Sequence, residues 1–434
     1  MSFTNQSKMF LYNLFPTLAG NFSLWPSHIA RAAQMGFNWI FLNPIQLPGM
    51  SGSLYSIKDY HALNPQLTDP ESPQAPQQQL REAIGAARER GMGVMIDLVI
   101  NHTAIDSPLT RQHPEWFRHD KDGSIAHPYA MDGDKKVVWG DLARLDHKNS
   151  RDAANMYDYF RGLLDYLIGL GFSGFRCDAA YQIPQETWKK LISDTKASHA
   201  GIVFAAETLG CSREQTIETA SAGFDYIFNS SKWWDFKSPW LMEQYDLFRE
   251  ICPSISFPES HDTPRVADEF NGNVNALRRS YLFSAFFSAG VMIPMGFEFG
   301  FIKRLHVVNT RPDDWEKTEM DISSFIGEVN RIKSDSEAFT TEAQTRIFHH
   351  KNNSSILIIE KRTPSEIAIA AINIDLNDPQ RFLCENIQGM LPGSIGEIRC
   401  MIPGKDTAVV SGALDHTMEP GDGIILIGKT KDAQ

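Results

Sequence analysis

The chain has 434 residues, too many for one small core, and its 42% hydrophobic and 22% charged content is ordinary for a soluble globular protein. A net charge of −12 disfavours a nucleic-acid partner and suits a neutral ligand such as a sugar. No apolar run approaches the roughly 20 residues of a membrane span, so no membrane association is expected.

The N-terminus lacks the basic and apolar segments of a signal peptide. The cysteines are odd in number and have no metal-type spacing, so reduced thiols in a cytoplasmic protein are expected. They are Cys177, Cys211, Cys252, Cys384 and Cys400.

Short apolar runs alternate with longer amphipathic ones over most of the chain, which is typical of βα units. Expected strands are 9–15, 39–42, 93–101, 175–178, 202–206, 226–229, 255–258 and 291–296. Expected helices include 76–90, 153–170, 185–197 and 274–288. Eight strands with intervening helices favour a (β/α)8 barrel over an open sheet, although periodicity alone does not separate the two.

Two segments depart from this pattern. Residues 103–149 form an unusually long connection after the third strand, rich in His, Asp, Gly and Trp, which predicts a small insertion domain. From about Phe339 the pattern changes to strands at 345–349, 355–359, 367–374 and 424–427, punctuated by turn residues. We therefore expect a barrel of residues 1–102 and 150–338, an insertion domain of 103–149, and a C-terminal antiparallel β-sandwich of 339–434.

Polar residues end several of the expected strands, where a barrel of this type places its working groups. The third strand ends in Asn101-His102, the fourth in Asp178, the fifth in Glu207, and the seventh leads into His261-Asp262. One such carboxylate is commonly a helix cap or an ion-pair partner. Several on separate strands suit glycoside cleavage with retention, in which one of two carboxyl groups about 5–5.5 Å apart attacks and the other protonates.

Taken together, these segments resemble the four signature regions of the α-amylase family, glycoside hydrolase family 13. The segments are 97–102, 174–178, the strand ending in Glu207, and 260–262, in the family's order. The stretch His113-Pro-Glu-Trp-Phe117 and Asp122-Gly-Ser are also similar to maltosyltransferases that use maltose 1-phosphate. The resemblance implies domain A for the barrel, domain B for the insertion and domain C for the tail.

The resemblance also implies roles. Asp178 matches the nucleophile, Glu207 the general acid/base, and Asp262 the third acid, which stabilises the transition state. The implied substrate-binding residues are Arg176, which pairs with the nucleophile, together with His102, His261 and Tyr55 around the sugar at subsite −1. Core packing is the competing interpretation of Tyr55, because Leu54 replaces the usual glycine before it.

The chain departs from the family pattern just after the nucleophile, where Tyr181 and Gln182 replace a Lys-His pair that binds glucan and, through the histidine carbonyl, calcium. Asn101 matches another calcium ligand, with Asp106 or Asp134 as further candidates. Polar capping of the strand end competes with that role. We expect no required cofactor, with calcium as the candidate ion.

Other residues carry two interpretations each. Arg265 is expected either to pair with an acidic barrel residue or to contact an anionic substrate group such as a phosphate. Trp233, Trp234 and Trp240 are sugar platforms or packing residues, and Lys303-Arg304 is expected in a solvated loop.

The predicted function is a retaining glycoside hydrolase that cleaves α-1,4-glucosidic bonds in an α-glucan or maltooligosaccharide through a covalent glycosyl-enzyme intermediate. A transglycosylase of the maltosyltransferase type, using the same site, is the alternative. A catalytically silent binding subunit and an unrelated α/β enzyme are the remaining hypotheses. The sequence does not indicate the oligomeric state.

Overall fold

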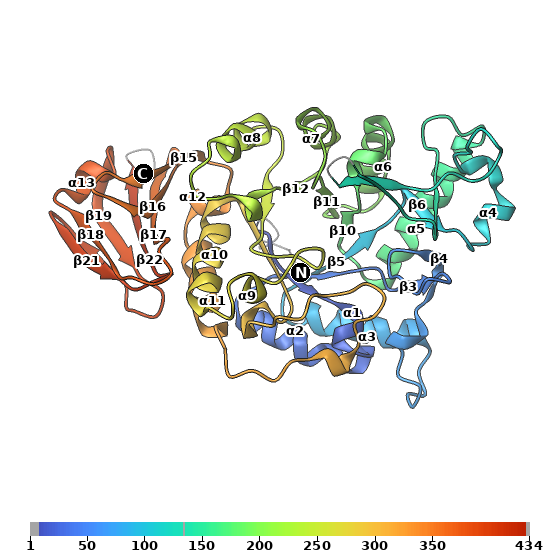
Figure 1. Cartoon of the computed structure of the whole chain (residues 1–434), viewed down its shortest axis with the longest axis horizontal. Helices are drawn as coiled ribbons and strands as arrows, with labels where there is room; N and C mark the ends of the chain where they lie inside the picture. The colour runs from blue at the N-terminus through green and yellow to red at the C-terminus, as the bar shows by residue number, and fades with distance from the viewer. Residues whose placement is uncertain (1–7, 133–134, 431–434) are drawn as a thin grey trace.

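The computed structural model describes residues 8–132 and 135–430, and Figure 1 shows their arrangement. Within this part of the chain, eight parallel strands close into a barrel in the order β1-β14-β13-β12-β11-β10-β5-β2. The barrel strands are β1 (Phe10–Leu14), β2 (Trp39–Leu42), β5 (Gly93–Leu98), β10 (Gly174–Cys177), β11 (Val203–Glu207), β12 (Tyr226–Phe228), β13 (Ser254–Ser256) and β14 (Gly290–Pro294). This closure confirms the predicted (β/α)8 barrel.

Helices surround the barrel because each presents an apolar stripe to the strands. In α5 (Ala153–Leu170), for example, the buried residues recur every three or four positions, and Gly171, with φ 121°, ends the helix. The other helices of the barrel region are α1 (Pro16–Ala19), α2 (Trp25–Gln34), α3 (Pro76–Arg88), α6 (Gln185–Ser198), α7 (Arg213–Ala220), α8 (Trp240–Phe248), α9 (Val266–Glu269), α10 (Val274–Phe287), α11 (Ser323–Ser334) and α12 (Glu337–Thr340).

Alternation along the strands divides the side chains between two cores. Trp39, Phe41 and Met95 belong to a compact cluster inside the barrel. Ile40 and Ile96, one position along, belong to the larger cluster beneath the helices. The same alternation decides which polar side chains of β5 and β10 face the interior.

The insertion follows β5 and lies at one end of the molecule, beside the barrel (Figure 1). It contains β6 (His102–Ala104), α4 (Leu109–Gln112), β7 (Tyr129–Asp132), β8 (Lys135–Val138) and β9 (Leu142–Arg144). β6 pairs with β9, and β7 pairs with β8, so the chain leaves and re-enters the barrel side by side. A hairpin of β3 (Gln46–Pro48) and β4 (Ile57–Leu63) lies after β2.

The C-terminal domain lies at the opposite end (Figure 1). In its described residues, six strands form an antiparallel sheet in the order β15-β16-β17-β22-β19-β20, and β18 pairs with β21. Its elements are β15 (Gln344–His350), β16 (Asn353–Arg362), β17 (Glu366–Asn373), β18 (Gln380–Cys384), α13 (Ile387–Met390), β19 (Ser394–Met401), β20 (Ala408–Val410), β21 (Leu414–Met418) and β22 (Gly423–Thr430). β17 packs on α10 and α12, which joins this domain to the barrel.

Candidate active site

The predicted acids lie at the C-terminal ends of neighbouring barrel strands. Asp178 directly follows β10, Glu207 ends β11, and β5 carries Asp97. Since β10 pairs with both β5 and β11, its Arg176 stands opposite Asp97 on one side and Ala205 on the other. Parallel pairing therefore gathers these side chains at one mouth of the barrel.

Arg176 connects three carboxylates. Its Nη1 atom donates to Asp97 Oδ1 at 2.8 Å and to Asp178 Oδ1 at 2.9 Å, and its Nη2 atom lies 3.0 Å from Glu207 Oε2. The arginine side chain is only 4% exposed, whereas those of Asp178 and Glu207 remain 13% and 15% exposed. The two candidate catalytic carboxylates thus share one guanidinium group and still face solvent.

The backbone after Asp178 also ties the two acids together. Ala179 adopts a left-handed conformation, with φ 40° and ψ 46°, which is unusual for a residue with a Cβ atom. Its N–H donates to Glu207 Oε2 at 2.7 Å. A sparsely populated conformation at this position is consistent with a functional constraint on both side chains.

Tyr55 is the centre of a second set of contacts. Its hydroxyl donates to Asp97 Oδ2 at 2.6 Å, lies 2.7 Å from His261 Nε2, and accepts a hydrogen bond from Asn43 Nδ2 at 2.9 Å. Its half-buried ring stacks on His261, with the ring centroids 5.6 Å apart. His102 Nε2 lies 3.1 Å from the Tyr55 carbonyl oxygen. The structure therefore places Tyr55 at the candidate site and packs it on His261, while its contact with a sugar stays a prediction.

Asp262 is the third of the predicted acids at the candidate site. Its Oδ2 atom lies 3.0 Å from His261 Nε2, and its side chain is 55% exposed, more than that of the other two predicted acids. Arg304, which we expected in a solvated loop, is exposed but donates to the Asp262 carbonyl oxygen. The structure thus brings Asp178, Glu207 and Asp262 together with Arg176 and His261 at one site.

The carboxyl groups differ in their proton affinities. Burial raises the pKa of Asp178 and of Glu207 to about 7, against the opposing effect of Arg176. Burial also acts on Asp262, but the neighbouring His261 outweighs it and lowers the pKa of Asp262 to about 2. Because Asp178 and Glu207 share Arg176, their protons come off as those of a coupled pair.

The pKa values of His102 and His261 are shifted in opposite directions. Burial lowers the pKa of His102 to about 4, so this imidazole is neutral at physiological pH. Burial acts in the same direction on His261, but Asp262 outweighs it and raises the pKa of His261.

Arg265 does not contact substrate. Its side chain is 1% exposed, and its Nη1 atom lies 2.7 Å from Glu259 Oε1. Its other donors reach the carbonyl oxygens of Lys303 and Met295. The hypothesis of a phosphate contact is therefore wrong, because all of these donors are used inside the protein; the interpretation as a barrel ion pair is confirmed.

The residues named for calcium do not form a complete set of ligands. Asn101 is buried; its Oδ1 atom has no hydrogen-bond partner among the described residues, and its amide nitrogen lies 3.5 Å from Gln182 Oε1. Asp106 instead pairs with Lys58 at 2.9 Å, and Asp134 lies outside the described residues. Asn101 therefore offers one free oxygen, whereas Ca²⁺ takes six to eight.

The three tryptophans after β12 differ in how far their side chains are exposed to solvent. Trp234 is 8% exposed and packs on Phe236 and Phe283, and Trp240 packs against the main core. Trp233 is 53% exposed, so it alone of the three keeps an open face. Cys177 is fully buried on the face of β10 opposite to Arg176, and all five cysteines are free thiols.

Two residues of the site escaped the sequence-based prediction. Asp97 was recognised only as the start of a signature segment, yet it is 1% exposed and bridges Arg176 and Tyr55. Asn43 follows β2 directly and donates to Tyr55. Its position at the C-terminal end of a barrel strand was the available signal.

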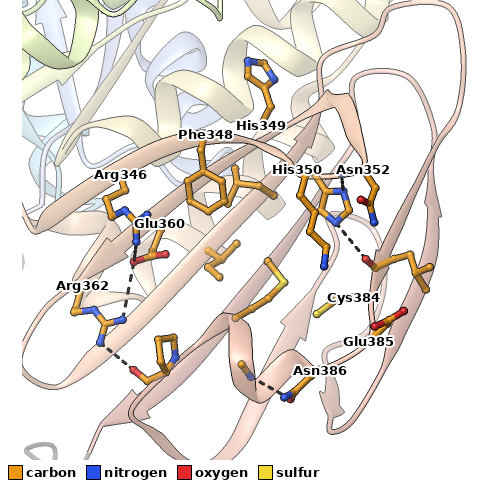
Figure 2. A pocket seen from close by; sticks show the side chains of 17 residues that line it. Arg346, Phe348, His349, His350, Asn352, Glu360, Arg362, Cys384, Glu385 and Asn386 are labelled. Atoms are coloured by element: carbon orange, nitrogen blue, oxygen red, sulfur yellow. Dashed lines mark hydrogen bonds and ion pairs between the residues drawn. The ribbon is translucent and has the colours of Figure 1, made fainter.

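A different cavity, of about 480 Å³, lies in the C-terminal domain and contains none of these residues (Figure 2). Phe348 and Met390 line it together with Arg346 and Arg362, and both arginines approach Glu360. Since it lacks the carboxylates at the barrel mouth, it is separate from the candidate active site.

The fold is a closed (β/α)8 barrel, and the candidate catalytic acids Asp178 and Glu207 share Arg176 at its C-terminal mouth. Residues 5–120 match the glucanotransferase domain of glycogen debranching enzyme. The chain is 25% identical over 409 residues to an α-1,4-glucan:maltose-1-phosphate maltosyltransferase of Burkholderia pseudomallei, a match covering 88% of this chain and 34% of that protein. It is 24% identical over 396 residues to the corresponding protein of Mycolicibacterium smegmatis, covering 82% of this chain and 54% of that protein.

Solved structures agree on the fold. The maltogenic α-amylase AmyB of Thermotoga neapolitana matches with a TM-score of 0.75 at 19% identity, covering 98% of this chain and 99% of that one. An α-amylase of Lactobacillus plantarum matches with a TM-score of 0.75 at 20% identity, covering 98% and 100%. These findings confirm the resemblance to the α-amylase family and the similarity to maltosyltransferases. The chain spans about a third to just over half of the length of these two maltosyltransferases.

Proposed function

We propose that this protein breaks α-1,4-glucosidic bonds with retention of configuration, through a covalent glycosyl-enzyme intermediate. The observation that carries the proposal is the pair of carboxylates, Asp178 and Glu207, that share Arg176 at the barrel mouth. Both have a pKa raised to about 7, so near neutral pH the coupled pair holds about one proton. One ionised and one protonated carboxyl group are what a retaining glycosidase requires.

In the first step, an oxygen of Asp178 attacks the anomeric carbon while Glu207 gives its proton to the leaving oxygen, and the glycosidic bond breaks. In the second step, the Glu207 carboxylate removes a proton from a water or a sugar hydroxyl group. That oxygen attacks the anomeric carbon and releases Asp178. Arg176 favours the ionised form of Asp178 whenever the ester is absent.

Asp262, His261 and Tyr55 are proposed to hold the sugar at the cleavage point. The low pKa of Asp262, about 2, keeps this acid ionised and able to accept hydrogen bonds from hydroxyl groups. Neutral His102 is proposed to contact the same sugar. Trp233, with its exposed face, is the candidate platform for a more distant sugar ring.

Hydrolysis and transfer stand as equal candidates because they share the first step and differ only in the acceptor. The curated relatives are named as maltosyltransferases, which supports transfer, whereas the structural neighbours named as amylases share the fold. Incubation with maltoheptaose, and with maltose 1-phosphate plus glucan, distinguishes the two by product chromatography. Free glucose or maltose indicates hydrolysis, and elongated glucan indicates transfer.

The proposed ligand is an α-glucan or maltooligosaccharide, with no nucleic-acid partner, consistent with the net charge of −12. Among the described residues, no helix combines the length and hydrophobicity needed to cross a bilayer. We also propose a cytoplasmic location, supported by the free thiols. No cofactor is required in this scheme; calcium at Asn101 is the one ion that the free Oδ1 atom leaves as a candidate.

The roles are tested by Asp178→Ala and Glu207→Gln, which we expect to abolish turnover while leaving the circular dichroism spectrum unchanged. Glu186→Gln, at a side chain that is 80% exposed on α6, is the matched control and should retain wild-type activity. Full activity in either of the first two variants would disprove the assignment, and an absence of turnover in the wild type would favour a silent binding subunit.

A further inference from the structure

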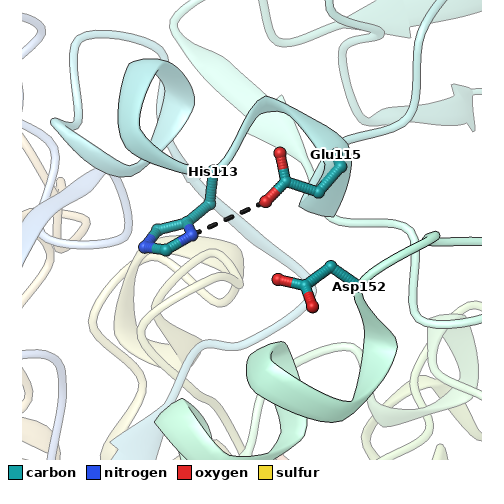
Figure 3. Close-up of side chains that lie close together, drawn as sticks. All are labelled: His113, Glu115 and Asp152. Carbon is teal, nitrogen blue, oxygen red and sulfur yellow. Dashed lines mark ion pairs between the residues drawn. The ribbon is translucent and has the colours of Figure 1, made fainter.

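Three potential metal ligands from the insertion and from the start of the helix that follows it lie close together. His113 and Glu115 flank Pro114 in the turn after α4, and Asp152 directly precedes α5. One ligand atom of each lies within 4.8 Å of the others, and Figure 3 shows the three side chains converging. Among the residues that the structure describes, no other group of three His, Cys, Asp or Glu side chains meets this condition.

Trp116 holds two of these ligands in place. Its ring stacks on the His113 imidazole, with centroids 3.9 Å apart and planes within 9°. Its indole N–H donates to Asp152 Oδ2 at 2.9 Å, and Asn155 donates to the other carboxylate oxygen at 2.7 Å. Each oxygen of Asp152 keeps a second lone pair, so these contacts orient the carboxylate without blocking it. Binding an ion therefore costs little side-chain ordering.

The local charge also favours a cation. His113 Nδ1 lies 3.6 Å from Glu115 Oε1, which is beyond ordinary hydrogen-bond length. No Lys or Arg of the described residues forms an ion pair with Glu115 or Asp152. Two neighbouring carboxylates without a permanent positive partner repel each other, and a divalent ion would remove that repulsion. The side chains of His113 and Glu115 are 37% and 36% exposed, so an ion and its waters can enter.

We propose that His113, Glu115 and Asp152 bind one zinc ion. An imidazole nitrogen with two carboxylate oxygens is a donor set that suits Zn²⁺, whereas Mg²⁺ and Ca²⁺ prefer oxygen ligands alone. Three protein ligands leave a position for water. The ion would link the turn after α4 to the start of α5, so its role is structural, and the proposal is independent of the glycosidase chemistry.

The test is calorimetric titration of zinc into the full chain after treatment with EDTA and dialysis. We expect one equivalent to bind, and Glu115→Gln and His113→Gln to weaken the affinity at least tenfold. His119→Gln removes an exposed histidine of the same insertion and should bind as the wild type does. If His113→Gln does not fold, Glu115→Gln decides, because the one contact recorded for its side chain is that with His113.

A second readout is the midpoint of thermal unfolding, which zinc should raise in the wild type and in His119→Gln but not in Glu115→Gln. Two outcomes would overturn the proposal: an absence of stoichiometric zinc binding, or wild-type affinity in Glu115→Gln. Equal stabilisation by Mg²⁺ would also overturn it, because the imidazole would then not be a ligand.

Discussion

Tyr55→Phe removes one oxygen atom from the centre of the candidate site. That oxygen contacts Asp97, His261 and Asn43 at 2.6–2.9 Å. A hydrogen bond to a charged group contributes about 1.5–3 kcal/mol, and unpaired buried partners add a desolvation cost. Since Tyr55 is only half-buried, water recovers part of the loss, and we expect the free energy of unfolding to fall by about 2 kcal/mol.

The same change should affect catalysis, because the hydroxyl group positions His261 against Asp262. We expect kcat/KM on a maltooligosaccharide to fall about tenfold or more, which corresponds to about 1.4 kcal/mol of transition-state stabilisation. Urea unfolding and steady-state kinetics measure the two effects. The matched control is Tyr281→Phe, whose buried hydroxyl donates to Asn330 at 2.6 Å away from the site. Equal kcat/KM in both variants would refute the positioning role of Tyr55.

Three further predictions concern charge. Burial raises the pKa of Asp178 to about 7, so the folded state keeps this carboxyl group protonated at pH values at which the unfolded state has lost the proton. This difference lowers the free energy of unfolding progressively as the pH rises from about 4 to 7. Asp178→Asn should therefore gain stability relative to the wild type as the pH rises from about 4 to 7, and the gain should level off above pH 7. Asp262→Asn should show no such trend, since the pKa of Asp262 is about 2 and its contribution is lost only as the pH falls towards that value. A flat difference for Asp178→Asn in urea unfolding would contradict this. Arg265→Met should lower the free energy of unfolding by about 3–5 kcal/mol, because it leaves the buried Glu259 carboxylate unpaired. Adding Glu259→Gln to this variant should recover part of the loss. Additive losses in the double variant would argue against a direct ion pair. Treatment with EGTA should leave turnover unchanged, and activity lost to EGTA and restored by Ca²⁺ would establish a required ion at Asn101 or elsewhere.

Much of the fold could be predicted from local patterns. The expected strand 39–42 and helix 153–170 agree with β2 and α5 to the residue, and most other barrel elements differ by one to three residues at an end. The predicted third strand was too long because Val99 and Ile100 are apolar and buried like strand residues, although the strand ends at Leu98. The domain boundaries at 102, 149 and 338 stay predictions.

The C-terminal domain was predicted less completely. β15, β16, β17 and β22 were expected, whereas β18 to β21 were not. Two of the missed strands give a weak hydrophobic signal: β20 is only three residues long and none of them is buried, and β21 carries exposed Asp415 and Thr417. Pairing with other strands stabilises them, and that information is not local.

By itself, the sequence determined which residue types end the barrel strands, and this was enough to predict the acids Asp178, Glu207 and Asp262 and the class of chemistry. Only the tertiary structure decided their partners. It paired Arg265 with Glu259, made Asp97 the bridge between Arg176 and Tyr55, and brought His113 close to Asp152. Backbone periodicity decides which face of a strand a side chain occupies, whereas a contact depends on which distant strands pair and in what register.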